Sequence, residues 1–124
     1  MTNVVFFEIC VDDLDAAASF YSRVFGWNIE RGDSDSDGWL ITTGGNDDPG
    51  IPGALSSRYD ELNTTVCTIE VPSVATYAKK ISEAGGKIVT PQITNPGEGV
   101  IQYCEDLEGN AFAIIEYEEA DEME

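Results

Sequence analysis

The sequence predicts an α+β fold built from two tandem βαβββ modules. A strand pattern followed by a helix pattern occurs twice, and each helix pattern stops at glycine. The two copies match at a constant offset of 60 residues, so that Ile9 corresponds to Ile69 and Gly26 to Gly86. A repeat in the same order and spacing indicates an internal duplication.

The first module is expected to begin with a strand over 4–11 that leads into a helix. Asp12 and Asp13 are typical helix-start residues, and Gly26 is a typical stop. Between them, apolar residues recur at helical spacing: Leu14, Ala17, Tyr21, Val24 and Phe25. Three short strands are predicted after the helix, over 27–30, 38–43 and 53–56.

The second module repeats this order. A strand is predicted over 66–71, Ser73 is the expected helix cap, and Gly85 and Gly86 end the helix. The apolar residues at helical spacing are Val74, Tyr77, Ile81 and Ala84. The strands that follow are predicted over 87–90, 100–104 and 111–117.

Each module has one sheet face covered by its helix and one bare face. Two such modules are expected to form one curved mixed sheet, with the helices outside and a ligand cleft on the concave face. We therefore predict a single domain over 1–124, with module one at about 1–60, module two at about 61–118 and an acidic tail over 119–124.

The charge excludes several kinds of partner. The 124 residues contain 24 acidic and 6 basic side chains, which gives a net charge of −18. Nucleic acid and anionic membranes bind through Lys and Arg, so neither is expected as a partner. No export signal or membrane span is evident, and the three cysteines form no pair at metal or disulfide spacing, which predicts a cytoplasmic protein.

The chain contains no histidine. This excludes nucleophiles activated by histidine, the usual neutral-pH general base and the commonest transition-metal ligand. Any catalysis would depend on carboxylates, Tyr, Lys or Cys. No cation is placed to stabilise an enolate except Arg58, which is expected at the cleft rim.

Several short motifs resemble one protein group. They are Phe7-Glu8-Ile9, Val11-Asp12-Asp13, Phe20-Tyr21, Val24-Phe25-Gly26-Trp27, Glu83-Ala84-Gly85-Gly86 and Asp106-Leu107-Glu108-Gly109-Asn110. In this order, and with the duplication, they resemble the glyoxalase/bleomycin resistance protein/dioxygenase group of the vicinal oxygen chelate superfamily. The resemblance implies the paired βαβββ fold, frequent homodimers and a function among lyases, isomerases, dioxygenases, thiol transferases and antibiotic-sequestering proteins.

The resemblance also implies four positions for metal ligands. They fall on Phe6, Val66, Ala113 and the segment 53–55, none of which offers a metal-binding side chain. We therefore expect the usual metal site to be absent, with no cofactor. The run Asp33 to Gly38 matches the first half of an EF-hand loop, but the position of its bidentate Glu falls on Gly44, so we interpret it as a hairpin turn.

Strand alternation predicts which side chains face the cleft. If Ile9 and Val11 face the helix, Phe6, Glu8 and Cys10 face the cleft, and Val66, Thr68 and Glu70 do so in the second module. The predicted ligand-binding residues are Phe6, Glu8, Trp39, Glu70 and Tyr103. The alternatives are that Glu8 and Glu70 lie in solvent at the rim, that Glu8 bonds to Thr68, and that Trp39 and Tyr103 fill the core beneath the helices.

These residues predict a protein that binds a small cationic or aromatic molecule without metal-dependent catalysis. One alternative is a lyase, isomerase or dioxygenase that recruits Mg²⁺ or Mn²⁺ through Glu8, Glu70 and Gln102. Another is a structural or partner-binding module. A homodimer is the expected assembly.

Overall fold

The computed structural model describes residues 2–31, 38–44, 50–57 and 64–118. It consists of two compact units, Val5–Val66 and Cys67–Glu124 with Met1–Val4. We call them the N-terminal and C-terminal units, and each contains one βαβββ module. This confirms the predicted α+β class with two modules. The single domain and the cleft stay predictions, and the acidic tail 119–124 lies outside the described residues.

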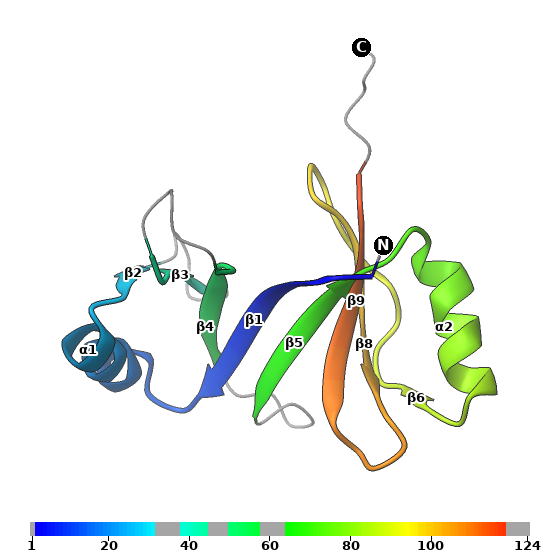
Figure 1. Ribbon diagram of the computed structural model, residues 1–124, viewed down its shortest axis with the longest axis horizontal. Coiled ribbons are helices and arrows are strands. Elements are labelled where there is room, and N and C mark those ends of the chain that lie inside the picture. The colour runs from blue at the N-terminus through cyan, green and yellow to red at the C-terminus, as the bar shows by residue number, and fades with distance from the viewer. Residues whose placement is uncertain (1, 32–37, 45–49, 58–63, 119–124) are drawn as a thin grey trace. The chain divides into compact units, whose positions relative to one another are not determined.

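The N-terminal unit is a small mixed sheet with one helix. Its elements are β1 (Val4–Val11), α1 (Leu14–Phe25), β2 (Asn28–Glu30), β3 (Trp39–Thr42) and β4 (Gly53–Ser57). The strand order is β2-β3-β4-β1, with β1 and β4 parallel and the other neighbours antiparallel (Figure 1). These bounds agree with the predicted ones within one or two residues.

Helix α1 begins and ends where its sequence predicts. The Asp13 carboxylate accepts a hydrogen bond from the Ala16 amide at 3.0 Å, which satisfies one of the free amides of the first turn. Gly26 ends the helix in the left-handed conformation, with φ at 76°, and its amide donates to the Ser22 carbonyl.

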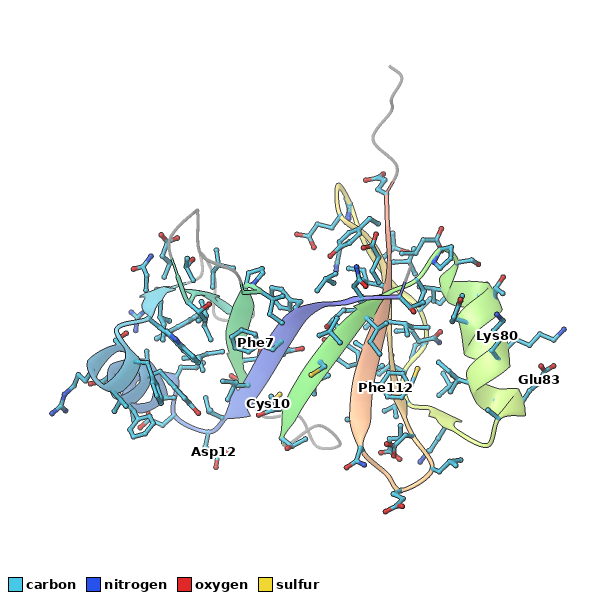
Figure 2. All side chains as sticks on the ribbon, in the orientation of Figure 1. Phe7, Cys10, Asp12, Lys80, Glu83 and Phe112 are labelled. Carbon is cyan, nitrogen blue, oxygen red and sulfur yellow. The ribbon has the colours of Figure 1, made fainter. Side chains whose placement is uncertain are left out.

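Aromatic rings join β1 to α1. The ring of Phe7, on β1 in Figure 2, lies 6.0 Å from that of Trp27, which in turn stacks on Tyr21 of α1 at 5.2 Å. Since Phe7 faces the helix, strand alternation turns Phe6, Glu8 and Cys10 to the other side of the sheet. This is the orientation of β1 that the sequence predicts.

The C-terminal unit has a similar arrangement with one more strand. Its elements are β5 (Thr65–Glu70), α2 (Val74–Glu83), β6 (Lys87–Ile88), β7 (Ile93–Asn95), β8 (Gly99–Glu105) and β9 (Ala111–Tyr117). The strand order is β5-β9-β8-β6, and β7 also pairs with β8 (Figure 1). The sequence did not predict β7, a three-residue strand in a segment punctuated by prolines.

The core of the C-terminal unit lies between α2 and the sheet. Its buried residues are Val71, Val74, Cys104 and Ile114, surrounded by half-buried apolar side chains that include Phe112. At the start of α2 the Ser73 hydroxyl accepts from the Thr76 amide, as predicted for a cap. Lys80 and Glu83 point away from this core (Figure 2).

Over the described residues, neither helix is long and apolar enough to cross a lipid bilayer.

Candidate functional site

The sheet of the C-terminal unit has one face toward α2 and one face away from it. Ile114 lies in the core under α2, and its register partners Ile69 and Gln102 share that side. Alternation therefore turns the neighbouring residues of all three strands to the opposite side, which we call the distal face. It carries Thr68, Glu70, Ile101, Tyr103, Ala113, Ile115 and Tyr117.

Glu70 and Tyr103, two of the predicted ligand-binding residues, therefore lie on the same face of one unit. Glu70 is in register with Ile115, and Tyr103 is in register with Ala113 two residues earlier on β9. Both side chains are half-buried. Their orientation is the predicted one, and their role in binding stays a prediction.

Tyr117 is a distal-face residue that the sequence reasoning missed. Burial raises the pKa of its phenol, and the negative charges of Glu70 and Glu98 raise it further. The phenol thus lies within electrostatic reach of two carboxylates. The period of two along β9, counted from Ala113, is the signal that would have placed Tyr117 on this face.

We expect the Glu70→Gln variant to lower the pKa of Tyr117 toward its ordinary value of 10 without reaching it, because burial, the larger cause, remains. A Glu83→Gln variant on the outer side of α2 should leave that pKa unchanged. The measurement is an ultraviolet titration of tyrosinate, with the signal of a Tyr117→Phe protein subtracted to isolate this residue. An equal shift in both variants would contradict the assigned geometry.

The raised pKa of Tyr117 also sets the sign of a stability change. The folded state holds the phenolic proton more tightly than the unfolded state. The contribution of Tyr117 to the free energy of unfolding should therefore be lost as pH rises above about 10 and through the folded-state pKa of this phenol.

In the N-terminal unit, Glu8 is buried and hydrogen-bonded. Only 8% of Glu8 is exposed, and its carboxylate accepts a hydrogen bond of 2.8 Å from the hydroxyl of Ser56, itself buried. Phe6 is half-buried on the same side of β1, and Cys10 is buried. The alternative that Glu8 lies in solvent is therefore wrong.

The predicted position of Trp39 on the cleft side is also wrong. Trp39 is in register with Leu55, which pairs with Ile9 on the side of β1 that faces α1. The guanidinium carbon of Arg31 lies 4.7 Å from the centre of the Trp39 ring, and Arg31 also pairs with Asp15 of α1 at 2.9 Å. Trp39 thus belongs to the packing between sheet and helix, which was the alternative interpretation of this residue.

The residues at the implied metal positions do not fit a metal ion. Val66, Ala113 and Leu55 are fully buried apolar side chains, and Phe6 has no donor atom. Among the described residues there is no group of three or more Cys, Asp or Glu side chains placed to hold a metal. The run at 33–37, with its EF-hand-like start, and Arg58 lie outside the described residues.

Gln102 cannot join Glu70 in a metal site. Gln102 lies on the α2 side of the sheet, where its amide nitrogen donates to the Thr90 carbonyl at 2.8 Å. Its amide oxygen is buried without a partner. Because Glu70 lies on the distal face, the alternative ligand set of Glu8, Glu70 and Gln102 is wrong in joining Gln102 to Glu70.

Cys104 is not built as a nucleophile. Burial raises the pKa of the Cys104 thiol to about 11, so this thiol stays protonated at neutral pH. Cys10 is buried too, and Cys67 is exposed; none of the three cysteines is in a disulfide in the part of the chain that the structure describes.

The sequence and the fold were compared with those of known proteins. Residues 3–36 match the family model described as bleomycin resistance protein-like N-terminal. No curated protein matches the sequence.

Solved structures match over nearly the whole chain. Methylmalonyl-CoA epimerase from Mycobacterium tuberculosis is 16% identical, with 94% of this chain and 88% of that chain covered and a TM-score of 0.64. A variant of the Streptomyces coelicolor epimerase, in complex with 2-nitronate-propionyl-CoA, is 15% identical, with 94% and 95% covered and a TM-score of 0.62.

A glyoxalase/bleomycin resistance protein/dioxygenase superfamily member from Vibrio splendidus 12B01 is 14% identical, with 95% of this chain and 100% of that chain covered and a TM-score of 0.67. The resemblance seen in the sequence motifs is thus confirmed at the level of the fold. The chain has the fold of the glyoxalase/bleomycin resistance protein/dioxygenase group, that of the vicinal oxygen chelate superfamily.

Proposed function

We propose that this chain binds a small organic molecule on the distal sheet face and does not use the metal-dependent chemistry that its resemblance implies. The observation that carries this proposal is the replacement of the implied ligand positions by the apolar residues Phe6, Val66 and Ala113. A divalent cation needs oxygen or nitrogen donors, which these side chains lack.

The distal face of the C-terminal unit offers the components of a binding surface. Tyr103 and Tyr117 provide aromatic area, Ile101 and Ile115 provide apolar area, and Glu70 provides a negative charge beside Tyr117. Aromatic faces and carboxylates together attract organic cations. In the N-terminal unit, considered by itself, Phe6 offers apolar area on the side of β1 that faces away from α1, and the Glu8 carboxylate on that side is bonded to Ser56.

The charge of the chain points to a ligand unlike that of the solved epimerases. One of those structures holds a CoA ester analogue, whose phosphates are strongly anionic. With 24 acidic and 6 basic residues, this chain repels such a ligand and attracts cations. We therefore propose a cationic or neutral aromatic ligand. We also propose a cytoplasmic location. Cys67 is an exposed thiol, and such a thiol stays reduced in the reducing environment of the cytoplasm.

Calorimetric titration of the 124-residue chain tests this proposal, with benzyltrimethylammonium and acetyl-CoA as the two probes. We expect the ammonium probe to bind and acetyl-CoA not to bind. Loss of one nearby charge is worth about 1 kcal/mol, so Glu70→Gln should weaken the ammonium affinity roughly fivefold. Glu83→Gln removes the same charge from the outer side of α2 and serves as the matched control.

Tighter binding of acetyl-CoA than of the ammonium probe would overturn the proposed ligand class, and equal weakening by both Glu variants would overturn the assigned face. Metal analysis of protein purified without chelator tests the other half of the proposal. Stoichiometric Mg²⁺ or Mn²⁺ that is lost in a Glu8→Ala variant would show that metal chemistry is retained.

A further inference from the structure

A second carboxylate lies at the edge of the distal face of the C-terminal unit. Glu98 is exposed in the turn between β7 and β8, directly before Gly99, which is in register with Tyr117. Two backbone hydrogen bonds of 2.9 Å hold this turn against β9: the Glu98 amide donates to the Asn95 carbonyl, and the Glu98 carbonyl accepts from the Glu118 amide. The backbone thus fixes the place of Glu98 beside the end of β9.

Glu70 and Glu98 approach Tyr117 from opposite sides. In the sheet, β9 lies between β5, which carries Glu70, and β8, which follows Glu98 (Figure 1). Burial raises the pKa of Tyr117, and the negative charges of both Glu70 and Glu98 raise it further. The two carboxylates therefore come from different strands but act on the same aromatic ring.

The ring and the charges beside it are open to a ligand. Tyr117 is 44% exposed, Glu98 is exposed and Glu70 is half-buried. In the part of the chain that the structure describes, no Lys or Arg forms an ion pair with either carboxylate. The distal face thus carries two negative charges that the described basic side chains do not neutralise.

We propose that the ligand of the distal face is an organic dication, with one positive group beside Glu70, the other beside Glu98 and its middle part over the ring of Tyr117. This inference rests on the proposed function and specifies the charge of the ligand. A monocation leaves one of the two carboxylates without a counter-charge, whereas a diamine or a bis-ammonium compound neutralises both. The face of the aromatic ring between the carboxylates also attracts cations.

A single metal ion does not fit this arrangement. Ca²⁺ and Mg²⁺ hold their oxygen ligands at about 2.0–2.6 Å. Strands β5 and β8 lie two strand spacings apart, which is about 10 Å. Among the described residues, no third Cys, Asp or Glu completes a set of metal ligands with Glu70 and Glu98. An extended molecule with two separate positive groups can reach both carboxylates.

Two matched probes test the charge of the ligand on the 124-residue chain. Benzyltrimethylammonium carries one quaternary ammonium group on a benzene ring, and 1,4-bis(trimethylammoniomethyl)benzene carries two at opposite positions of the ring. In calorimetric titrations we expect the dication to bind about fivefold more tightly, because it gains one further contact between charges. The Glu98→Gln variant should lose this preference and still bind the monocation.

Glu108→Gln is the matched control for Glu98→Gln. Glu108 is also an exposed turn residue of this unit, but it precedes β9, whereas Tyr117 ends that strand. The control removes the same charge at the other end of β9, so the preference for the dication should remain. An equal loss in both variants would trace the preference to the net charge of −18 and would overturn the proposal.

The same titrations separate this inference from the proposed function. If the monocation bound in a way that depends on Glu70 and the dication bound no more tightly, only the inference of a dication would be overturned. If neither probe bound, the proposed function would be overturned with it. A preference that persisted in Glu98→Gln would also overturn the inference, because the second charge would then lie elsewhere.

A titration of Tyr117 tests the place of the bound dication. Quaternary ammonium groups stay charged at alkaline pH, so a saturating dication beside this phenol should lower the pKa of Tyr117. The measurement is the ultraviolet signal of tyrosinate, with that of a Tyr117→Phe protein subtracted. An unchanged pKa in the presence of the bound dication would show that the ligand lies away from Tyr117 and would overturn the proposal.

Discussion

Replacement of Gly99 by alanine is expected to lower the free energy of unfolding by about 3 kcal/mol or more. Gly99 has φ at 137°, where L side chains are strained. A Cβ atom there would also overlap the Glu116 carbonyl oxygen and lie 2.9 Å from the Tyr117 Cα. These are backbone atoms of the paired strand β9, so they cannot turn aside as the end of a side chain would.

Gly97→Ala separates conformational strain from overlap. Gly97 lies in the same β7–β8 hairpin with φ at 83°, but a Cβ atom at this position would meet no other atom within 4 Å. The loss of stability should therefore be that of strain alone, about 1–2 kcal/mol. Urea unfolding followed by circular dichroism compares the two variants, and equal losses would contradict the close approach of β8 to β9 at Gly99.

The local features of both modules could be predicted from the sequence because they depend on residues near each other in the chain. Asp13 and Ser73 cap the helices, Gly26 ends α1, and the alternation along β1 gives the side on which Glu8 lies. Each of these depends on one turn or one strand period. Because the two modules correspond at an offset of 60 residues, each feature predicted in one module could also be predicted in the other.

The faces of the short strands could not be predicted in this way. In β3, of four residues, Trp39 and Leu40 are both apolar, so alternation alone does not show which one faces α1. The register with Leu55 of β4 decides it, and that partner is distant in sequence. Gln102 is a different case, because β8 has seven residues and Gln102 is adjacent to Tyr103, so alternation alone would have placed the two side chains on opposite faces.

Adjacent residues of β9 lie on opposite faces of the sheet, so we expect one substitution to affect mainly stability and the other mainly ligand binding. Ile114 is 2% exposed in the core beneath α2, so Ile114→Ala should lower the free energy of unfolding by about 2–5 kcal/mol. Ile115 is half-buried on the distal face, in register with Glu70. Ile115→Ala should therefore cost less stability and weaken binding of the benzyltrimethylammonium probe. Urea unfolding and calorimetric titration measure the two quantities.

Ile114→Ala and Ile115→Ala remove the same atoms from adjacent residues, so each is the control for the other. At a temperature where both variants are folded, Ile114→Ala should bind the probe as the unchanged chain does, because its side chain lies on the α2 side. If Ile114→Ala weakened binding as much as Ile115→Ala, the ligand would not be held by the distal face. If Ile115→Ala were as unstable as Ile114→Ala, the distal face would be part of the core, and a ligand would have no access to Glu70 and Tyr117.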